Sequence, residues 1–271
     1  MSVETGRKIV DYLLDQYERN DSDFINWNTR AVVLDFIGGE PLLEATLIEQ
    51  ICDYWFSECF HRDIPLAPFT RISFATNGQL WFSSEAQHLI EKYHDLMSIT
   101  ISIDGVQDLH DMYRLDEHGN GSFVKAWTAF QDGKRRFGWA NSKMTFVPGS
   151  FPYISDSLKM MLDEGCSDVA CNYAYEPVYT PADGRSLYEQ LKIVSDYIVD
   201  NELDVVVTIL DSLLGGKAKD DKNFCGGTGA MLSFAPDGSA YPCIRLVWKK
   251  PRKSASEAST MDYMSLMSKN V

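Results

Sequence analysis

Short apolar segments alternate with longer amphipathic segments along most of the chain, and this alternation limits the fold more than any other feature. Apolar runs of four to eight residues are typical of buried strands, and apolar residues at helical spacing indicate helices. Repeated strand–helix–strand units pair their strands in parallel. We expect strands at 31–37, 71–76, 99–104, 143–147, 168–173 and 204–210, and helices at 3–17, 42–60, 83–96, 121–137, 154–163 and 184–201. The fold class is therefore predicted to be α/β with a parallel sheet.

Glycine, proline and polar residues follow the expected strands at the point where each strand ends. These segments are Gly38-Gly39-Glu40-Pro41, Thr76-Asn77-Gly78, Asp104-Gly105, Pro148-Gly149 and Asn172 to Glu176-Pro177. Parallel sheets bind ligands at the carboxyl ends of their strands, in barrels and in doubly wound sheets alike. Glycine and proline also mark simple turns. Five polar strand ends in succession favour a ligand-binding rim over simple turns.

A different pattern begins after residue 203. Residues 231–235 and 240–241 are expected to form a hairpin around the turn Pro236-Asp237-Gly238. This hairpin would bring Cys225 and Cys243 to the same side. The two thiols are either a buried reduced pair or metal ligands.

Charge and composition exclude several kinds of partner. The 271 residues include 25 basic and 39 acidic side chains, a net charge of −14, which argues against nucleic acid and anionic membranes. No apolar run approaches the roughly 20 residues that span a bilayer, and the first residues lack a signal-peptide pattern. The cytoplasm is therefore the expected location. The six cysteines, Cys52, Cys59, Cys166, Cys171, Cys225 and Cys243, are not expected to form a disulfide framework there.

The order and spacing of the strand-end motifs resemble the radical S-adenosylmethionine (radical SAM) enzymes, in their peptide-modifying branch with a C-terminal SPASM domain. The motifs that carry the resemblance are Gly38-Gly39-Glu40-Pro41, Thr76-Asn77-Gly78, Ser102-Ile103-Asp104-Gly105, His110 to Arg114, and Gly119 to Phe123. Between Cys225 and Cys243, twelve residues precede Gly238 and four follow it, which resembles the opening of a SPASM domain. The resemblance covers roughly residues 1–247 and includes sulfatase-maturing and sactisynthase-like relatives.

The resemblance implies a set of cofactor-binding residues. The segment Gly38, Gly39, Glu40 and Pro41 would hold the ammonium of S-adenosylmethionine, and Thr76 and Asn77 would lie in the same site. Ser102 and Arg114 would bind the methionine carboxylate, since a guanidinium can grip both oxygens. Asp104 either contacts the ribose or caps its turn, and His110 is expected to make local hydrogen bonds. Cys225 and Cys243 would be ligands of an auxiliary iron–sulfur cluster.

The sequence departs from the family at both ends. The CxxxCxxC motif that holds the radical SAM [4Fe–4S] cluster is absent, and no cysteine follows Cys243. The resemblance implies an incomplete, open TIM-like barrel of the (βα)6 type over 1–212, whose first strand and cluster loop would precede Met1. Residues 213–271 would be the start of a SPASM or twitch hairpin region. Ile244 stands where sulfatase-maturing relatives carry an acidic base.

The implied function is a peptide-modifying enzyme, inactive as written. Family members form a 5′-deoxyadenosyl radical that abstracts hydrogen from a peptide side chain, with thioether crosslinking as one outcome. The implied partners are a ribosomally made precursor peptide and a reductant such as flavodoxin or ferredoxin. Two alternatives stay open: a non-catalytic remnant that binds a peptide or nucleotide, and an ordinary barrel enzyme with a divalent metal or a phosphate. The last has only Glu40, Asp104 and Glu176 as acidic strand-end residues.

Overall fold

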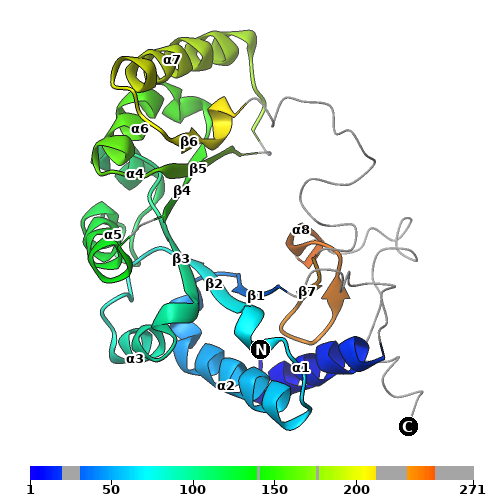
Figure 1. Cartoon of the computed structure of the whole chain (residues 1–271). Coiled ribbons are helices and arrows are strands. Elements are labelled where there is room, and N and C mark those ends of the chain that lie inside the picture. Colours follow the sequence, from blue (N-terminus) through cyan, green and yellow to red (C-terminus); the bar gives the residue numbers. More distant parts are fainter. Residues whose placement is uncertain (20–30, 139–140, 175–176, 212–230, 248–271) are drawn as a thin grey trace. The chain divides into compact units, whose positions relative to one another are not determined.

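A computed structural model describes residues 1–19, 31–138, 141–174, 177–211 and 231–247. The helices are α1 (Val3–Glu18), α2 (Ala45–His61), α3 (Ser84–Lys92), α4 (Gln107–Tyr113), α5 (Phe123–Phe137), α6 (Ile154–Asp163), α7 (Pro181–Asp200) and α8 (Ile244–Val247). The strands are β1 (Val32–Phe36), β2 (Thr70–Thr76), β3 (Met97–Ser102), β4 (Asn141–Phe146), β5 (Asp168–Tyr173), β6 (Val206–Val207), β7 (Ser233–Phe234) and β8 (Ala240–Tyr241) (Figure 1). Within the described ranges, no helix is long and apolar enough to cross a membrane.

Six strands form one sheet in chain order, from β1 to β6. Each neighbouring pair from β2 to β6 is parallel. The register pairs Ser102 of β3 with Lys143 of β4, and Lys143 with Ala170 of β5. The predicted α/β fold with a six-stranded parallel sheet is confirmed.

The chain divides into two compact units, and each has its own core. One contains residues 1–34, 46–71 and 217–271, and the other contains 35–45 and 72–216. The predicted division at 212/213 is not tested by this partition and stays a prediction.

The smaller unit joins α1 to α2 through a network of charges around Arg62. The Arg62 guanidinium donates to Asp11 and Asp15 of α1 at 2.7 Å each, and to Glu58 of α2 at 3.1 Å. Trp55 of α2 is fully buried and donates its indole N–H to Thr70 Oγ1 at 3.0 Å. The described part of this unit also holds the short β7–β8 hairpin, as the sequence predicts.

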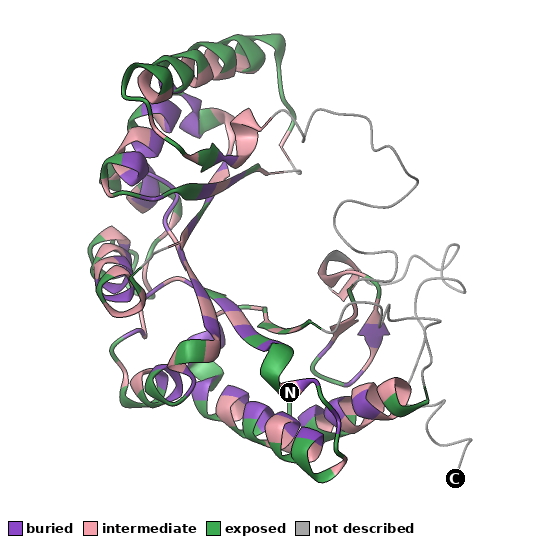
Figure 2. Ribbon diagram, viewed as in Figure 1, coloured by how far each residue is buried: buried purple, intermediate pink, exposed green. Residues whose placement is uncertain are grey.

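The larger unit places its helices on one face of the sheet (Figure 1). Ile72 and Phe74 of β2 and Ile99 and Ile101 of β3 are buried and lie on that face. Figure 2 shows in purple the buried residues of the strands and helices. Alternate residues of the same strands are exposed or half-buried and lie on the opposite face. The helix-covered face is therefore the core, and the opposite face can receive other groups.

Several elements differ from their expected bounds, and two of these differences have clear local reasons. Helix α7 begins at Pro181 rather than 184, because Thr180 caps its N-terminus and exchanges hydrogen bonds with Asp183. The expected strand 204–210 is reduced to β6, since Thr208–Leu210 forms a 3-10 turn. Thr208 Oγ1 donates to the Val169 carbonyl of β5 at 3.0 Å, which fixes this turn against the sheet.

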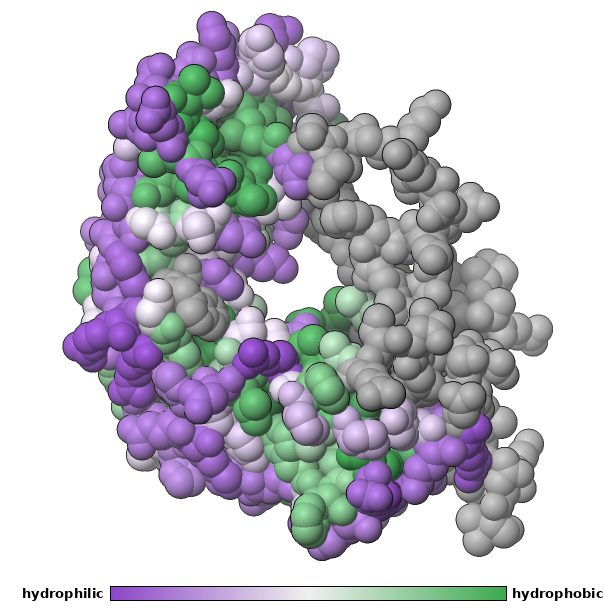
Figure 3. Space-filling model, in the orientation of Figure 1, coloured by the Kyte–Doolittle hydropathy of each residue, from purple (hydrophilic) through white to green (hydrophobic). Residues whose placement is uncertain are grey.

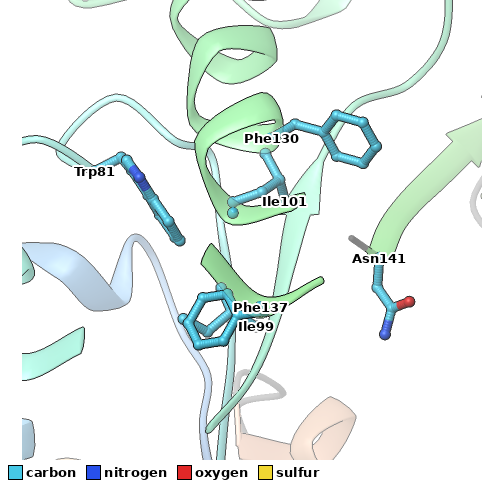
Figure 4. Close-up of a pocket in the computed structure, with 7 residues that line it drawn as sticks. Trp81, Ile99, Ile101, Phe130, Phe137 and Asn141 are labelled. Carbon is cyan, nitrogen blue, oxygen red and sulfur yellow. The ribbon is translucent and has the colours of Figure 1, made fainter. Parts of the chain in front are cut away.

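A small apolar cavity lies between α5 and the sheet, on the helix-covered side. Its volume is about 10 Å³, room for one water, and Figure 4 shows the aromatic and aliphatic side chains that line it. The lining residues are Trp81, Ile99, Ile101, Phe130, Gly133, Phe137 and Asn141. Because most of its lining is apolar and none of the rim residues takes part, we assign this cavity to core packing.

Replacing Gly133 with alanine is expected to stabilise the protein by about 1 kcal/mol, the usual cost of a glycine inside a helix. A Cβ at Gly133 would meet Trp81 ring atoms at 3.7 Å, an ordinary van der Waals distance. Gly184→Ala on α7 is the matched control, since its Cβ would meet nothing within 4 Å. Urea denaturation should show both variants stabilised, with Gly133→Ala at least equal to the control. A destabilised Gly133→Ala variant would contradict this packing.

Candidate functional site

The carboxylate of Glu40 ties the end of β1 to the end of β2. One oxygen, Oε1, accepts from Thr76 Oγ1 at 2.6 Å and from the Leu42 N–H at 3.1 Å. The other oxygen accepts from the Asn77 N–H at 2.8 Å. A carboxylate that receives three hydrogen bonds is held firmly. Glu40 therefore acts first on its own chain, holding the turn after β1 against the end of β2.

The glycine pair before Glu40 turns the backbone in a conformation that other residues rarely adopt. Gly38 has φ 123° and Gly39 has φ 41°. A Cβ at Gly39 would meet nothing within 4 Å, so conformation rather than crowding requires glycine there. The turn consequently presents bare backbone to open space at the strand end, which suits a ligand with hydrogen-bonding groups.

Thr76 and Asn77 shape the loop after β2. Thr76 is fully buried, and besides its bond to Glu40 its hydroxyl accepts from the Gly78 N–H at 3.1 Å. The Asn77 side-chain oxygen accepts from the Gln79 N–H at 2.9 Å. These polar groups therefore make hydrogen bonds to neighbouring residues of the strand ends. Their roles toward a cofactor stay predictions.

Asp104 and Arg114 form a two-point ion pair at the end of β3. Arg114 Nε donates to Asp104 Oδ2 at 2.5 Å, and its Nη2 donates to Oδ1 at 3.3 Å. Asp104 also accepts from the Thr145 N–H of β4 at 2.9 Å. The Asp104 side chain is 9% exposed and that of Arg114 is 31% exposed. The carboxylate thus links β3, β4 and Arg114, while part of the Arg114 side chain stays exposed.

His110 serves local hydrogen bonding, as expected from the sequence. Its Nδ1 accepts from the Asp104 N–H at 3.3 Å, so the hydrogen-bond network assigns the proton to Nε2, which lies 3.0 Å from Ser122 Oγ. The Ser122 hydroxyl in turn donates to the Arg114 carbonyl at 2.9 Å. Burial lowers the pKa of His110, which keeps the imidazole neutral. This relay fixes the segment that carries Arg114.

Three residues on the face opposite the helices were missed by sequence reasoning. They are Asp35 of β1, Ser73 of β2 and Lys143 of β4, and Ser102 lies beside Lys143 in register on the same face. The signal was present, because each is a polar residue between apolar or buried neighbours in a strand. Interpreting the strands as apolar runs hides this alternation of buried and polar residues.

The structure tests the predictions for four of the six cysteines and leaves that for Cys225 and Cys243 untested. Cys52, Cys59, Cys166 and Cys171 are buried, as expected for core residues. Burial raises the pKa of Cys59 and Cys166 to about 11 and that of Cys171 to about 12, so these remain thiols. Cys225 lies outside the described residues, and Cys243 is half-buried just before α8. The proposed cluster ligation by this pair therefore stays a prediction.

The rim and the cysteines differ in how well they fit the implied cofactors. The bare Gly38–Gly39 turn suits the amino group of S-adenosylmethionine, and Ser102 and Arg114 could bind a carboxylate. A [4Fe–4S] cluster does not fit the described residues, which contain no group of three or more His, Cys, Asp or Glu able to hold a metal ion. That finding also counts against the divalent-metal alternative, although Glu176 lies outside the described residues.

Fold and rim together define an α/β protein with a parallel sheet and polar turns at the carboxyl ends of its strands. No protein-family model and no curated protein sequence matches the chain. Among solved structures, it is similar to native anSMEcpe with bound AdoMet, at 21% identity and a TM-score of 0.66, over 90% of this chain and 65% of that one.

Streptococcus suis SuiB is a second structural relative. SuiB bound to S-adenosylmethionine matches 81% of this chain and 51% of its own, at 14% identity and a TM-score of 0.56. SuiB bound to precursor peptide SuiA matches 93% of this chain and 55% of its own, at 13% identity and a TM-score of 0.54. The TM-scores show that the proteins share a fold, and at identities this low the similarity shows the fold alone. The chain spans 65% of the length of anSMEcpe.

Proposed function

We propose that this chain is a radical SAM-type peptide-modifying protein that binds S-adenosylmethionine at the carboxyl ends of β1–β3. The observation that carries the proposal is the Glu40 bridge, which ties two strand ends and leaves the glycine turn bare beside it. The similarity to anSMEcpe with bound AdoMet supports this ligand. The similarity to SuiB bound to a precursor peptide supports a peptide as the second partner.

Each rim residue has a proposed task toward the cofactor. The backbone of Gly38 and Gly39 receives the ammonium, while Glu40 positions that backbone and adds a negative charge. Ser102 and the outward end of the Arg114 guanidinium bind the methionine carboxylate, and Asp104 holds Arg114 in place. Bound S-adenosylmethionine supplies a sulfonium whose reductive cleavage starts hydrogen abstraction in this family, with electrons from a flavodoxin or ferredoxin.

The cluster that delivers those electrons has no ligand set in this sequence, because CxxxCxxC is absent. This specific departure favours a second candidate, a binding protein that holds the cofactor and a peptide without cleaving the cofactor. Formation of 5′-deoxyadenosine distinguishes the two candidates, because only the enzyme would cleave S-adenosylmethionine. Anaerobic incubation with iron, sulfide, dithionite and S-adenosylmethionine supports the enzyme if this product exceeds a no-protein blank, and the binding protein if it does not.

Glu40→Gln is expected to weaken S-adenosylmethionine binding by about tenfold, the size of one lost charged hydrogen bond. The new amide cannot accept from all three donors that now contact Glu40, so the glycine turn loses its support. Isothermal titration calorimetry measures the affinity. Glu44→Gln is the matched control, since Glu44 is exposed and belongs to the 3-10 turn Pro41–Glu44 that Glu40 caps. Equal affinity in both variants would contradict the proposed role of Glu40.

A further inference from the structure

Asp111 of α4 is a half-buried carboxylate that joins its own helix to the start of the next one. Hydrophilic side chains are common on the outer helices of the larger unit, as Figure 3 shows along α7, so an exposed charge alone marks no site. Asp111 differs, because its Oδ1 accepts from the Phe123 N–H at 2.8 Å. Phe123 is the first residue of α5, and a negative charge is favourable at a helix N-terminus. The carboxylate therefore ties α4 to α5.

Gly121 leaves the space that the Asp111 carboxylate occupies. A Cβ at residue 121 would collide with Cγ and with both oxygens of Asp111. Gly121 does not have a left-handed φ, so its backbone conformation does not call for glycine. The close approach of the carboxylate is therefore what requires glycine at this position.

Ser122 lies between these two contacts and holds the main chain of Arg114. The Arg114 carbonyl accepts from the Ser122 N–H at 3.2 Å and from the Ser122 hydroxyl at 2.9 Å. Asp111 packs against the residue before Ser122 and bonds the residue after it, so it fixes where these two donors lie. Asp111 thus acts on the Arg114 backbone through the residues on either side of Ser122.

The guanidinium of Arg114 depends on this support if it is to bind a ligand. It has five N–H donors, and Asp104 accepts from two of them. A guanidinium grips a carboxylate at two points in a fixed plane, so small displacements reduce the affinity. If the Arg114 backbone shifts while the ion pair with Asp104 persists, the remaining donors change their direction. The position of the backbone therefore decides where a ligand carboxylate can bind.

We propose that Asp111 is a positioning residue for Arg114, which lets the guanidinium receive a ligand carboxylate while it stays paired with Asp104. This inference rests on the proposed function, since the task of Arg114 toward the methionine carboxylate belongs to it. It adds that the affinity for this carboxylate, and not for the rest of the ligand, depends on Asp111. A merely structural role would weaken binding of every part of the ligand alike.

The test compares S-adenosylmethionine with decarboxylated S-adenosylmethionine, which keeps the sulfonium and the amino group but lacks the carboxylate. Isothermal titration calorimetry on the full chain is done at about 0.3 M salt, which screens the attraction of the acidic chain for the more cationic analogue. The parent chain should bind S-adenosylmethionine about tenfold more tightly, the effect of one charge-assisted hydrogen bond. Arg114→Met should bring this affinity ratio close to one. Asp111→Ala should lower it to about threefold, half of that free energy, with the affinity for the analogue unchanged.

Three further variants separate positioning from other effects. Asp111→Asn keeps an oxygen that can accept from the Phe123 N–H, so it should retain most of the affinity ratio. Gly121→Ala places a methyl group where the carboxylate lies, so it should lower the ratio and replaces Asp111→Ala if that variant does not fold. Asp108→Ala is the matched control, since it removes the same charge from an exposed position in the first turn of α4.

Three results would overturn this inference alone. These are a parental affinity ratio in Asp111→Ala, an equal loss of affinity for both ligands in that variant, or the same fall of the ratio in Asp108→Ala. An unchanged ratio in Arg114→Met would overturn the proposed task of Arg114, and a parent chain that does not bind S-adenosylmethionine would overturn the proposed function. Either of these last two results would remove the inference as well, and neither resembles the results that refute Asp111 alone.

Discussion

Replacing Asp104 with alanine is expected to lower the free energy of unfolding by about 3 kcal/mol or more, the usual cost of breaking a buried ion pair. The change removes the partner of the Arg114 guanidinium and the acceptor of the Thr145 N–H in one step. The Arg114 side chain is only 31% exposed, so its charge would remain poorly hydrated. The loss should therefore exceed that of an ordinary surface change by several-fold.

Urea denaturation, analysed with one m-value for all variants, measures the change in the free energy of unfolding. Asp200→Ala at the exposed end of α7 is the matched control and should stay within about 0.5 kcal/mol of the parent chain. The double variant Asp104→Ala/Arg114→Met should lose less stability than the two single variants together, since neither charge is then left alone. A loss below about 1 kcal/mol for Asp104→Ala would show that this ion pair contributes little to folding.

The sheet could be predicted from the sequence because short apolar runs alternate with segments of helical periodicity six times along the chain. Sequence reasoning missed helix α4, which has only seven residues, too few for a clear apolar pattern. This helix matters for the site, since the Arg114 N–H donates to the His110 carbonyl at its end. Short helices that depend on tertiary contacts have no clear pattern of apolar residues and are therefore hard to predict from the sequence.

The contacts of the rim residues could not be derived from spacing. Glu40 was found through its motif, but its partners Thr76 and Asn77 lie at the end of the next strand, 36 and 37 residues further along the chain. Arg114 was expected to bind a ligand carboxylate, and the structure shows two of its donors on Asp104. Both results depend on how neighbouring strand ends meet, which residue type alone does not specify.

Replacing Gly105 with alanine is expected to have the largest effect of any single change considered, about 4 kcal/mol or more. A Cβ there would lie 2.1 Å from Ser157 Oγ and 2.7 Å from Ser157 Cβ, on a buried helix that cannot move aside cheaply. Gly105 also has φ +140°, which is unfavourable for a residue with a side chain. The same Ser157 hydroxyl accepts from the Val106 N–H at 3.1 Å, so the turn after β3 would lose that bond as well.

Gly138→Ala separates conformational strain from collision, because Gly138 has φ +71° and no atom within 4 Å of its added Cβ. It should cost only about 1 kcal/mol. If Gly105→Ala fails to fold, Gly105→Ala/Ser157→Gly should recover soluble protein, since the colliding hydroxyl is gone. Thermal melts and urea curves compare the variants. Equal losses for Gly105→Ala and Gly138→Ala, with no rescue by Ser157→Gly, would mean that close packing of α6 against the end of β3 does not control this turn.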